Sequence, residues 1–448
     1  MTSADLLSQP ITSLLKRLAI PSSLGLLFNT LYNIVDTYYA GLISTEALSA
    51  LSSSAFLFFV IVGIGYGGSS GITTLVGNAL GEKESEKARL FASKGLGILL
   101  LLGCIMGILG ILTAPSMLLM LSVEETYRPL ALRYIQIILL GAPFFFATFG
   151  LNAILVATGD TKSYRNSLIF GFFANIVLNP LFIYGAYGIP SMGIGGIAFA
   201  TVLIQIITSV YLTCKVFKTG LMQLSFFMPD RTNSHIITQQ SLPSALNMLM
   251  ISFGSLIALY FVSHYGFKAV AGYGIGYRVE QLFLLPCLGI SSATLSLVSN
   301  NMGAKRVDRV RQTILTSLIY GYGVAFIGLC ILFLTHTWLI SRFDKDVDVI
   351  AYGSDYITVM MLLFFGYVTH FVCVATLQGM KRPIMIFYVG AFRQLLAPCI
   401  VYFFIVSVWH LDFIWMWVGL GFIVYSSALV LLWYTYRIVN TSFKEHFS

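Results

Sequence analysis

The chain has 448 residues, of which 57% are hydrophobic and only 10% are charged, and its formal net charge is +8. Its mean hydropathy is +0.86. Soluble domains carry about a quarter of charged residues, so this composition excludes a water-soluble globule and with it a nucleic-acid-binding or a secreted disulfide-bonded protein. We therefore expect an integral membrane protein.

Twelve apolar stretches are long enough to cross a bilayer as helices, since one span needs about 20 residues. In chain order these stretches are centred near Leu31, Ile61, Met106, Phe144, Ile176, Ile204, Leu256, Leu288, Gly328, Phe365, Cys399 and Val424. The six cysteines stand singly within such stretches, which indicates packing residues and neither a redox centre nor a zinc site. The predicted fold class is all-α integral membrane.

The basic residues indicate how the spans are oriented. Nineteen of the 26 Lys and Arg residues fall in loops on one side of the membrane, five fall on the other side, and Arg278 and Arg393 fall inside predicted spans. Loops that face the cytoplasm accumulate Lys and Arg. We expect both termini in the cytoplasm and the protein in the cytoplasmic (inner) membrane, with many passes.

The two halves of the chain repeat each other at an offset of 222 residues. Pro21 matches Pro243, and the stretch from Asn78 to Lys83 matches the stretch from Asn300 to Lys305. Later in the halves we expect the offset to become 220, which aligns Thr158–Lys162 with Gln378–Arg382.

Six spans per half is an even number, so both halves enter the membrane from the same side. Parallel six-helix halves, related by a pseudo-two-fold axis along the membrane normal, are a transporter architecture in which the substrate cavity lies between the halves. We expect an N-terminal lobe at 1–218, a cytoplasmic linker at 219–238 and a C-terminal lobe at 239–448.

Polar residues within the first predicted span suggest a functional site. Asn29, Tyr32, Asn33 and Asp36 follow the spacing of one helical face, and an ionisable residue at membrane depth is by default a functional candidate. At the same offset the second half has Ile251, Gly254, Ser255 and Ala258, so the stripe belongs to the first half alone. The alternative is a buried carboxylate that serves packing.

A second polar set lies in the span centred near Ile176. Asn175 and Asn179 are four residues apart and share a helical face, and Pro180 next to them frees backbone carbonyls. Asn152 and Thr201 in neighbouring spans could complete a pocket around Asp36. The alternative is that each of the four only joins helices by hydrogen bonds.

The second half has its own candidates at membrane depth. Glu280, Arg278 and Arg393 are predicted to form either a structural ion pair, most simply between Glu280 and Arg393, or contacts to substrate in the cavity. Tyr367 and His370 could stack on a cationic ligand or serve packing. No metalloprotease, serine-hydrolase or nucleotide-binding motif is present in the sequence, so we expect neither an enzyme nor a cofactor.

The sequence resembles the multidrug and toxic compound extrusion (MATE) family of secondary transporters over nearly its whole length. The stretches that carry the resemblance are Leu18–Pro21, Val35–Gly41, Gly77–Gly81, Asn152–Leu155, Gly159–Lys162, Asn175–Ile183, Gly195–Thr201 and Asn301–Ala304. Within the family the chain looks closer to the DNA-damage-inducible branch than to the sodium-driven branch of norfloxacin exporters.

This resemblance implies export of amphiphilic, often cationic drugs by a membrane-embedded monomer, in exchange for H⁺ or Na⁺. It implies that Asp36 takes the coupling ion, supported by Tyr32, Asn152, Asn175, Asn179 and Thr201, and that the first helix bends near Pro21. Relatives commonly carry aspartate at the position of Asn179, which leaves Asp36 as the single carboxylate. We expect protons, with Na⁺ held by Asp36, Asn175 and Asn179 as the other possibility. A lipid or lipid-linked oligosaccharide flippase of the same superfamily is the alternative function.

Overall fold

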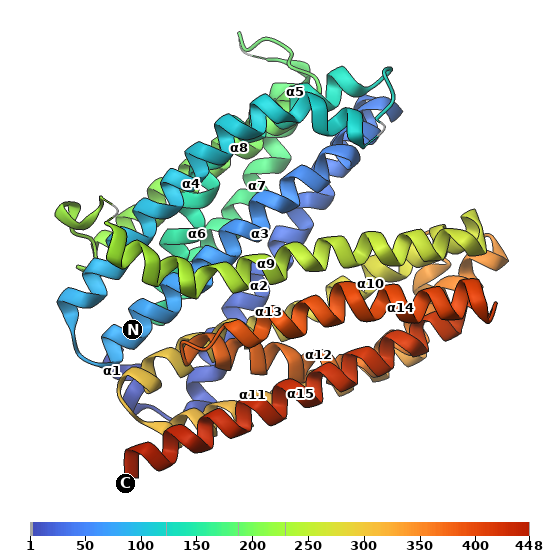
Figure 1. The fold of residues 1–448 in the computed structure, drawn as a ribbon. Coiled ribbons are helices and arrows are strands. Elements are labelled where there is room, and N and C mark those ends of the chain that lie inside the picture. The colour runs from blue at the N-terminus through green and yellow to red at the C-terminus, as the bar shows by residue number, and fades with distance from the viewer. Residues whose placement is uncertain (1–2, 122, 187, 229, 448) are drawn as a thin grey trace. The chain divides into compact units, whose positions relative to one another are not determined.

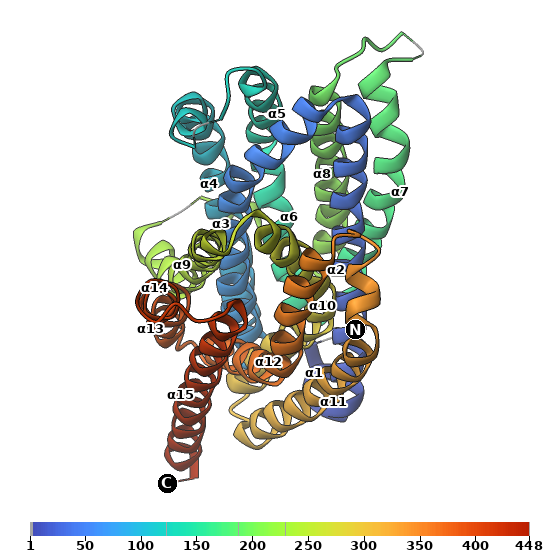
Figure 2. The same ribbon diagram turned by 90° about the vertical axis from the view of Figure 1, so that its right-hand side faces the viewer.

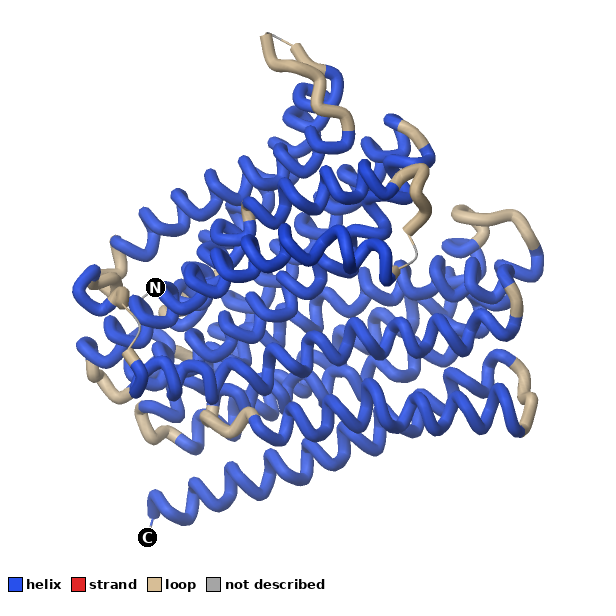
Figure 3. The backbone as a smooth tube through the Cα atoms, turned by 45° about the horizontal axis from the view of Figure 1, so that its top comes forward, coloured by secondary structure: helices blue, strands red, loops and turns tan. Residues whose placement is uncertain are grey.

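A computed structural model describes the backbone of residues 3–121, 123–186, 188–228 and 230–447, and their side chains apart from those of 3, 4, 56 and 443–447. Within these ranges the chain folds into helices and connecting loops without any strand (Figure 3). The all-α prediction is therefore confirmed. The side chain of Lys444, one of the predicted cytoplasmic basic residues, lies outside the described part.

The helices follow the predicted spans closely. Before the linker they are α1 (Ser3–Ser8), α2 (Ile11–Ile43), α3 (Thr45–Gly81), α4 (Ser85–Met120), α5 (Arg128–Leu140), α6 (Ala142–Ala157), α7 (Lys162–Tyr184) and α8 (Ile194–Phe217). After it come η1 (Leu224–Phe226), α9 (Arg231–Val262), η2 (Ser263–Tyr265), α10 (Phe267–Gly303), α11 (Val307–Ile340), α12 (Val347–Gly379), α13 (Ile384–Ala391), η3 (Phe392–Leu396), α14 (Ala397–Phe403), η4 (Phe404–Val408) and α15 (Phe413–Phe447). Figure 1 labels most of them along the chain.

Among the described residues, 11 helical segments are long and apolar enough to cross a membrane, and one bent pair makes a twelfth. The bent pair is α5 with α6, which meet at 47°. Gly141 separates these helices and Pro143 stands at the start of α6, where a missing N–H costs the helix nothing. The predicted count of twelve spans thus holds, with one span broken near its middle.

Four helices end in a left-handed residue at the side where the basic loops lie. Lys83 and Lys305 have φ of 61° and 56°, and Gly159 and Lys381 have φ of 82° and 59°. A left-handed residue lets the N–H that follows reach back to a carbonyl of the last helical turn. The three lysines stand at positions where glycine is preferred, and the left-handed conformation of each costs about 1 kcal/mol of folding free energy.

These helix ends show that the repeat keeps its offset of 222 residues. The Asp160 N–H donates to Leu155 O at 2.8 Å, and the Arg382 N–H donates to Leu377 O at 2.8 Å, so the two turns match residue for residue at 222. The predicted shift to 220 is therefore wrong. It arose because Gly159 resembles Gly379 in the sequence, whereas Gly159 corresponds in conformation to Lys381.

The chain divides into two compact units, described here separately. The first holds Leu24–Ala245, and the second holds Ala4–Ser23 together with Leu246–Ser448. Both boundaries lie inside a long helix, two residues after Pro21 in α2 and two residues after Pro243 in α9. The predicted lobes at 1–218 and 239–448 with a linker at 219–238 remain a prediction from topology, while the contacts place residues 219–245 with the first unit.

Glycines hold the first segments of α2 and α9 close to their neighbours within each unit. A Cβ on Gly67 of α3 would lie 2.3 Å from the Ala245 backbone of α9. A Cβ on Gly289 of α10 would lie 2.0 Å from the Ser23 hydroxyl of α2. Gly67 and Gly289 correspond at the offset of 222, so each unit uses the same glycine contact.

Candidate functional site

The carboxylate of Asp36 is the centre of a buried hydrogen-bond cluster in the first unit. Asp36 lies in α2 with 5% of its surface exposed. Its Oδ1 accepts hydrogen bonds from the side-chain amides of Asn175 and Asn179, each at 2.8 Å. Its Oδ2 accepts a hydrogen bond from the Thr201 hydroxyl at 3.4 Å. Figure 2 shows the helices that contribute these groups, α2, α7 and α8, running alongside one another.

The spacing of the two asparagines on α7 explains how both reach one oxygen. Residues four apart lie on one face of a helix, and Asn179 also donates to the Asn175 side-chain oxygen at 3.0 Å. Both asparagines are fully buried. The side-chain amide of Asn179 thus donates to both Asp36 and Asn175, while its own side-chain oxygen has no hydrogen-bond partner.

Tyr32 joins the cluster through Thr201. The Tyr32 hydroxyl donates to Thr201 Oγ1 at 3.0 Å, which completes a chain of hydrogen bonds from Tyr32 through Thr201 to Asp36. The other two members of the predicted stripe, Asn29 and Asn33, have exposed side chains. The functional face of α2 is thus narrower than the sequence pattern indicates.

Two predicted residues do not contact this cluster. Asn152 on α6 has a buried side-chain oxygen without a partner, as has Thr148 one turn before it, and no hydrogen bond joins either of them to Asp36 in the described chain. Pro21 lies inside α2, in the segment that belongs to the second unit. Any role of Pro21 at the Asp36 cluster would therefore act through the helix.

Asp36 has no basic partner among the described residues. The ion pairs found there lie near helix ends, namely Lys87 with Glu82 and Glu84, Lys94 with Asp230, and Lys268 with Asp346 and Asp348. A buried, unpaired carboxylate is costly unless it is hydrogen-bonded and takes up a proton or a cation. The Asp36 carboxylate is thus hydrogen-bonded by three donors and lacks a fixed counter-charge.

Sequence analysis missed one residue of this region. Tyr134 on α5 is buried, with 7% of its surface exposed, and lies within electrostatic reach of Asp36 and of Tyr32. The repeat provides a signal that could have found it, because Tyr134 corresponds at the offset of 222 to Tyr356, which holds the buried acid of the second unit.

Glu280 forms a separate buried site in the second unit. Its Oε2 accepts a hydrogen bond from the Tyr356 hydroxyl of α12, and only 3% of Glu280 is exposed. The Arg393 guanidinium lies over the Tyr367 ring, 5.8 Å from its centre, and Arg393 Nε has no hydrogen-bond partner. Among the described ion pairs none joins Glu280 to Arg393, so the direct pair weighed from the sequence is not formed.

The remaining predicted residues of the second unit differ in their surroundings. His370 is buried with 2% exposed and its Nδ1 has no partner, whereas Arg278 is exposed. Arg393 lies in η3, a π-helical turn, and such turns are frequent at functional sites. No group of three or more His, Cys, Asp or Glu side chains able to hold a metal ion occurs in the described ranges.

Comparisons with known proteins agree with this architecture. The family model described as MatE matches residues 21–181 and 243–403, which correspond to each other at the offset of 222. The chain is 27% identical over 332 residues to the probable multidrug resistance protein YoeA of Bacillus subtilis, with 72% of each chain covered. It is also 27% identical over 364 residues to a protein named FAD transporter from Shewanella oneidensis, with 79% of each chain covered.

A solved structure of a MOP superfamily transporter from Pyrococcus furiosus has the same fold. The TM-score is 0.92 at 22% identity, and 99% of each chain is covered.

The closer likeness to the DNA-damage-inducible branch remains a prediction. The expected MATE membership, and with it the expectation of a transporter rather than an enzyme, is confirmed by the family match. Because that match covers more than half of the residues and falls on both repeats, the chain belongs to the MatE family.

Proposed function

We propose that this protein exports amphiphilic and often cationic drugs across the cytoplasmic (inner) membrane in antiport with a cation bound at Asp36. The observation that carries the proposal is the buried carboxylate of Asp36, which accepts three hydrogen bonds and has no basic partner in the described chain. A carboxylate so placed exchanges a proton or cation more readily than one fixed in an ion pair. The names of relatives such as YoeA support drugs as substrates.

Protons fit the Asp36 cluster better than Na⁺. Two amide N–H groups and one hydroxyl point at the Asp36 oxygens, whereas a bound Na⁺ needs several oxygens directed at it. To hold Na⁺, Asn175 and Asn179 would have to turn their oxygens inward and give up their hydrogen bonds to Asp36 and to each other. Coupling to H⁺ requires only that Asp36 gain and lose a proton.

The transport cycle follows from this assignment. Asp36 takes up a proton from outside, the donors around it rearrange, and α2 bends near Pro21, which releases the drug outward. Loss of the proton to the cytoplasm restores the donors. In the second lobe Glu280, Arg393, Tyr367 and His370, with the exposed Arg278, supply polar contacts to substrate. The protein works as a monomer with both termini in the cytoplasm.

Dye efflux from proteoliposomes tests the coupling site. With an imposed pH gradient, Asp36→Asn should abolish ethidium transport, because the amide cannot exchange a proton. Asp355→Asn is the matched control, since Asp355 lies outside the cluster and should keep normal transport. Replacing Na⁺ by choline should leave the rate unchanged. Full activity of Asp36→Asn would overturn the assignment, and collapse in choline would replace H⁺ by Na⁺.

The alternative function is a flippase for a lipid or a lipid-linked oligosaccharide. Such a protein needs a strongly cationic cavity for a pyrophosphate, and the membrane-depth arginines here are Arg278 and the buried Arg393. Expression in a strain that lacks its own efflux pumps separates the two functions. Drug export predicts growth on ethidium or norfloxacin that depends on Asp36, whereas a flippase would leave drug sensitivity unchanged.

A further inference from the structure

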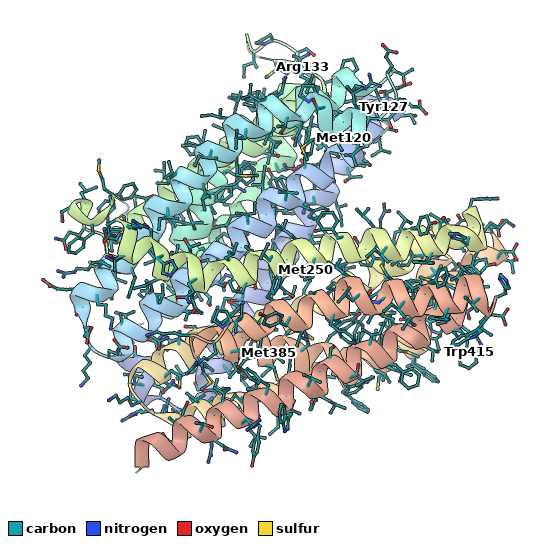
Figure 4. All side chains as sticks on the ribbon, viewed as in Figure 1. Met120, Tyr127, Arg133, Met250, Met385 and Trp415 are labelled. Atoms are coloured by element: carbon teal, nitrogen blue, oxygen red, sulfur yellow. The ribbon has the colours of Figure 1, made fainter. Side chains whose placement is uncertain are left out.

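A lateral cavity of about 360 Å³ lies within the second unit, apart from the Asp36 cluster. Met385, Tyr388, Val389 and Phe392 line it from α13 and η3, and Ser426, Ser427 and Val430 line it from α15. Its volume is in the range of small-molecule sites. Tyr388, Phe392 and Val430 are 61%, 47% and 44% exposed, so the cavity opens on the surface of the unit. Figure 4 labels Met385 on α13.

The wall of this cavity offers almost no hydrogen-bonding groups. The Ser426 hydroxyl donates to Ile423 O at 3.1 Å, and the Ser427 hydroxyl donates to Val424 O at 2.8 Å, so both serines are satisfied by their own helix. The other lining side chains are apolar or aromatic. Such a wall fits an alkyl chain better than the polar or charged part of a drug.

The helix that forms the first wall of this cavity differs from its counterpart in the first half of the repeat. The far end of the cavity is Phe392, the first residue of the π-helical turn η3, whereas the corresponding helix of the first half, α7, is a regular α-helix throughout. The π-helical turn next to the cavity is therefore not shared by the two halves.

Basic residues stand at one end of the cavity on both helices that line it. Lys381 and Arg382 are exposed just before α13, and Arg382 precedes Met385 by three residues. Arg437 of α15 is exposed and follows Val430 by seven residues, or about 10 Å. Arg437 lies over the Trp433 ring at 5.1 Å, an aromatic neighbour typical of the membrane interface.

We propose that this cavity binds one anionic phospholipid of the cytoplasmic leaflet, with an acyl chain between α13 and α15 and its phosphate near Arg382 and Arg437. A membrane offers no hydrophobic gain for moving an acyl chain from lipid onto protein, so the selectivity must come from the headgroup. Juxtamembrane Lys and Arg supply that selectivity for anionic lipids. The proposal rests on the proposed orientation of the termini and is independent of coupling at Asp36.

Photo-crosslinking tests this site in proteoliposomes of phosphatidylethanolamine and phosphatidylglycerol. A trace of phosphatidylglycerol with a diazirine in one acyl chain is activated, and the labelled peptides are identified by mass spectrometry. We expect peptides of α13 and α15 to be labelled about tenfold more than by the matching phosphatidylcholine probe. Val430→Trp should fill the cavity and cut this labelling at least fivefold.

Two control variants make the result decisive. Leu429→Trp places the same ring on the neighbouring residue of α15, which is 64% exposed and does not line the cavity, and should keep full labelling. Arg382→Gln with Arg437→Gln should remove the preference for the anionic probe, whereas Arg342→Gln should not. If the Val430→Trp protein does not fold, Val430→Phe and Ser427→Leu fill the same cavity with smaller side chains and should also reduce the labelling.

Three outcomes would overturn the proposal. Equal labelling of α13 and α15 by both probes would exclude headgroup selection, and unchanged labelling in a folded Val430→Trp protein would place the chain elsewhere. Displacement of the label by tetraphenylphosphonium would make the cavity a drug site instead of a lipid site. Loss of transport in Asp36→Asn with normal lipid labelling leaves this inference intact, so its failure is distinguishable from failure of the proposed function.

Discussion

The side-chain amide of Asn179 donates to Asp36 at 2.8 Å, while the side-chain oxygen of Asn179 has no partner. The position next to Asp36 on α7 therefore holds a neutral donor and no second carboxylate. Asn179→Asp should make the protein transport at higher pH, because two neighbouring carboxylates share a proton that is lost only when the medium is more alkaline. We expect the pH of half-maximal efflux to rise by about one unit, measured in proteoliposomes from pH 5 to 9.

Asn152→Asp is the control for this shift. Asn152 is a partly buried asparagine of the same unit, on α6, with no hydrogen bond to Asp36 in the described chain. Its pH profile should stay near that of the unmodified protein. A profile of Asn179→Asp that coincides with the unmodified one would contradict the place of Asn179 beside the coupling carboxylate.

Tyr32 and Thr201 are coupled at Asp36, since the Tyr32 hydroxyl donates to the Thr201 hydroxyl, which in turn donates to the Asp36 carboxylate. Thr201→Val should slow efflux severalfold, and adding Tyr32→Phe to it should cost little more. A double-mutant cycle on initial rates should give a coupling energy of about 1 kcal/mol, the usual contribution of one such hydrogen bond. Additive effects of the two substitutions would show that Tyr32 acts independently of Thr201.

Gly67 should tolerate no side chain. A Cβ there would lie 2.3 Å from the backbone of Ala245, which cannot move as a side chain can. Gly67→Ala should therefore lower the melting temperature in detergent, whereas Gly41→Ala should not, because nothing lies within 4 Å of a Cβ at Gly41. Equal melting temperatures for the two variants would refute the close packing of α3 on α9.

The hydrogen bond from Tyr356 stabilises the second unit by satisfying the buried Glu280 carboxylate. Tyr356→Phe should cost about 1 kcal/mol, the usual net contribution of one hydrogen bond, because Tyr367 and Arg393 still interact with Glu280. Glu280→Leu in the same background removes the buried carboxylate and should recover part of the loss. Thermal unfolding in detergent measures both changes, and a Tyr356→Phe protein as stable as the unmodified one would speak against this account.

The sequence predicts the architecture well because long apolar stretches and basic loops are strong local signals. Asp36, Asn175, Asn179, Thr201 and Tyr32 were also identified correctly as neighbours, since their helical spacing and the family resemblance agree. The direction in which each polar side chain faces is harder to predict from the sequence. The sequence does not show that Asn29 and Asn33 are exposed, that Asn152 has no hydrogen bond to Asp36, or that Arg393 lies over Tyr367 instead of pairing with Glu280.

The register of the later repeat could not be read from residue identity. A left-handed turn is set by backbone conformation, and Gly159 and Lys381 fill the same conformation with different residues. The π-helical turn at Phe392–Leu396 could not be predicted from the sequence either, because its residues are ordinary helix formers in an apolar span. Both features appear only once the hydrogen bonds are known.

The boundaries that follow Pro21 and Pro243 imply that neither half of the chain is a complete folding domain. Each half begins with a segment that packs in the other unit, Ala4–Ser23 in the second and the start of α9 in the first. Halves made as separate polypeptides would therefore each present an unpaired segment and an uncovered glycine, Gly67 or Gly289. Such fragments correspond to the two separated chains of a domain-swapped dimer, in which each chain completes the fold of the other. They should therefore fold only when produced together.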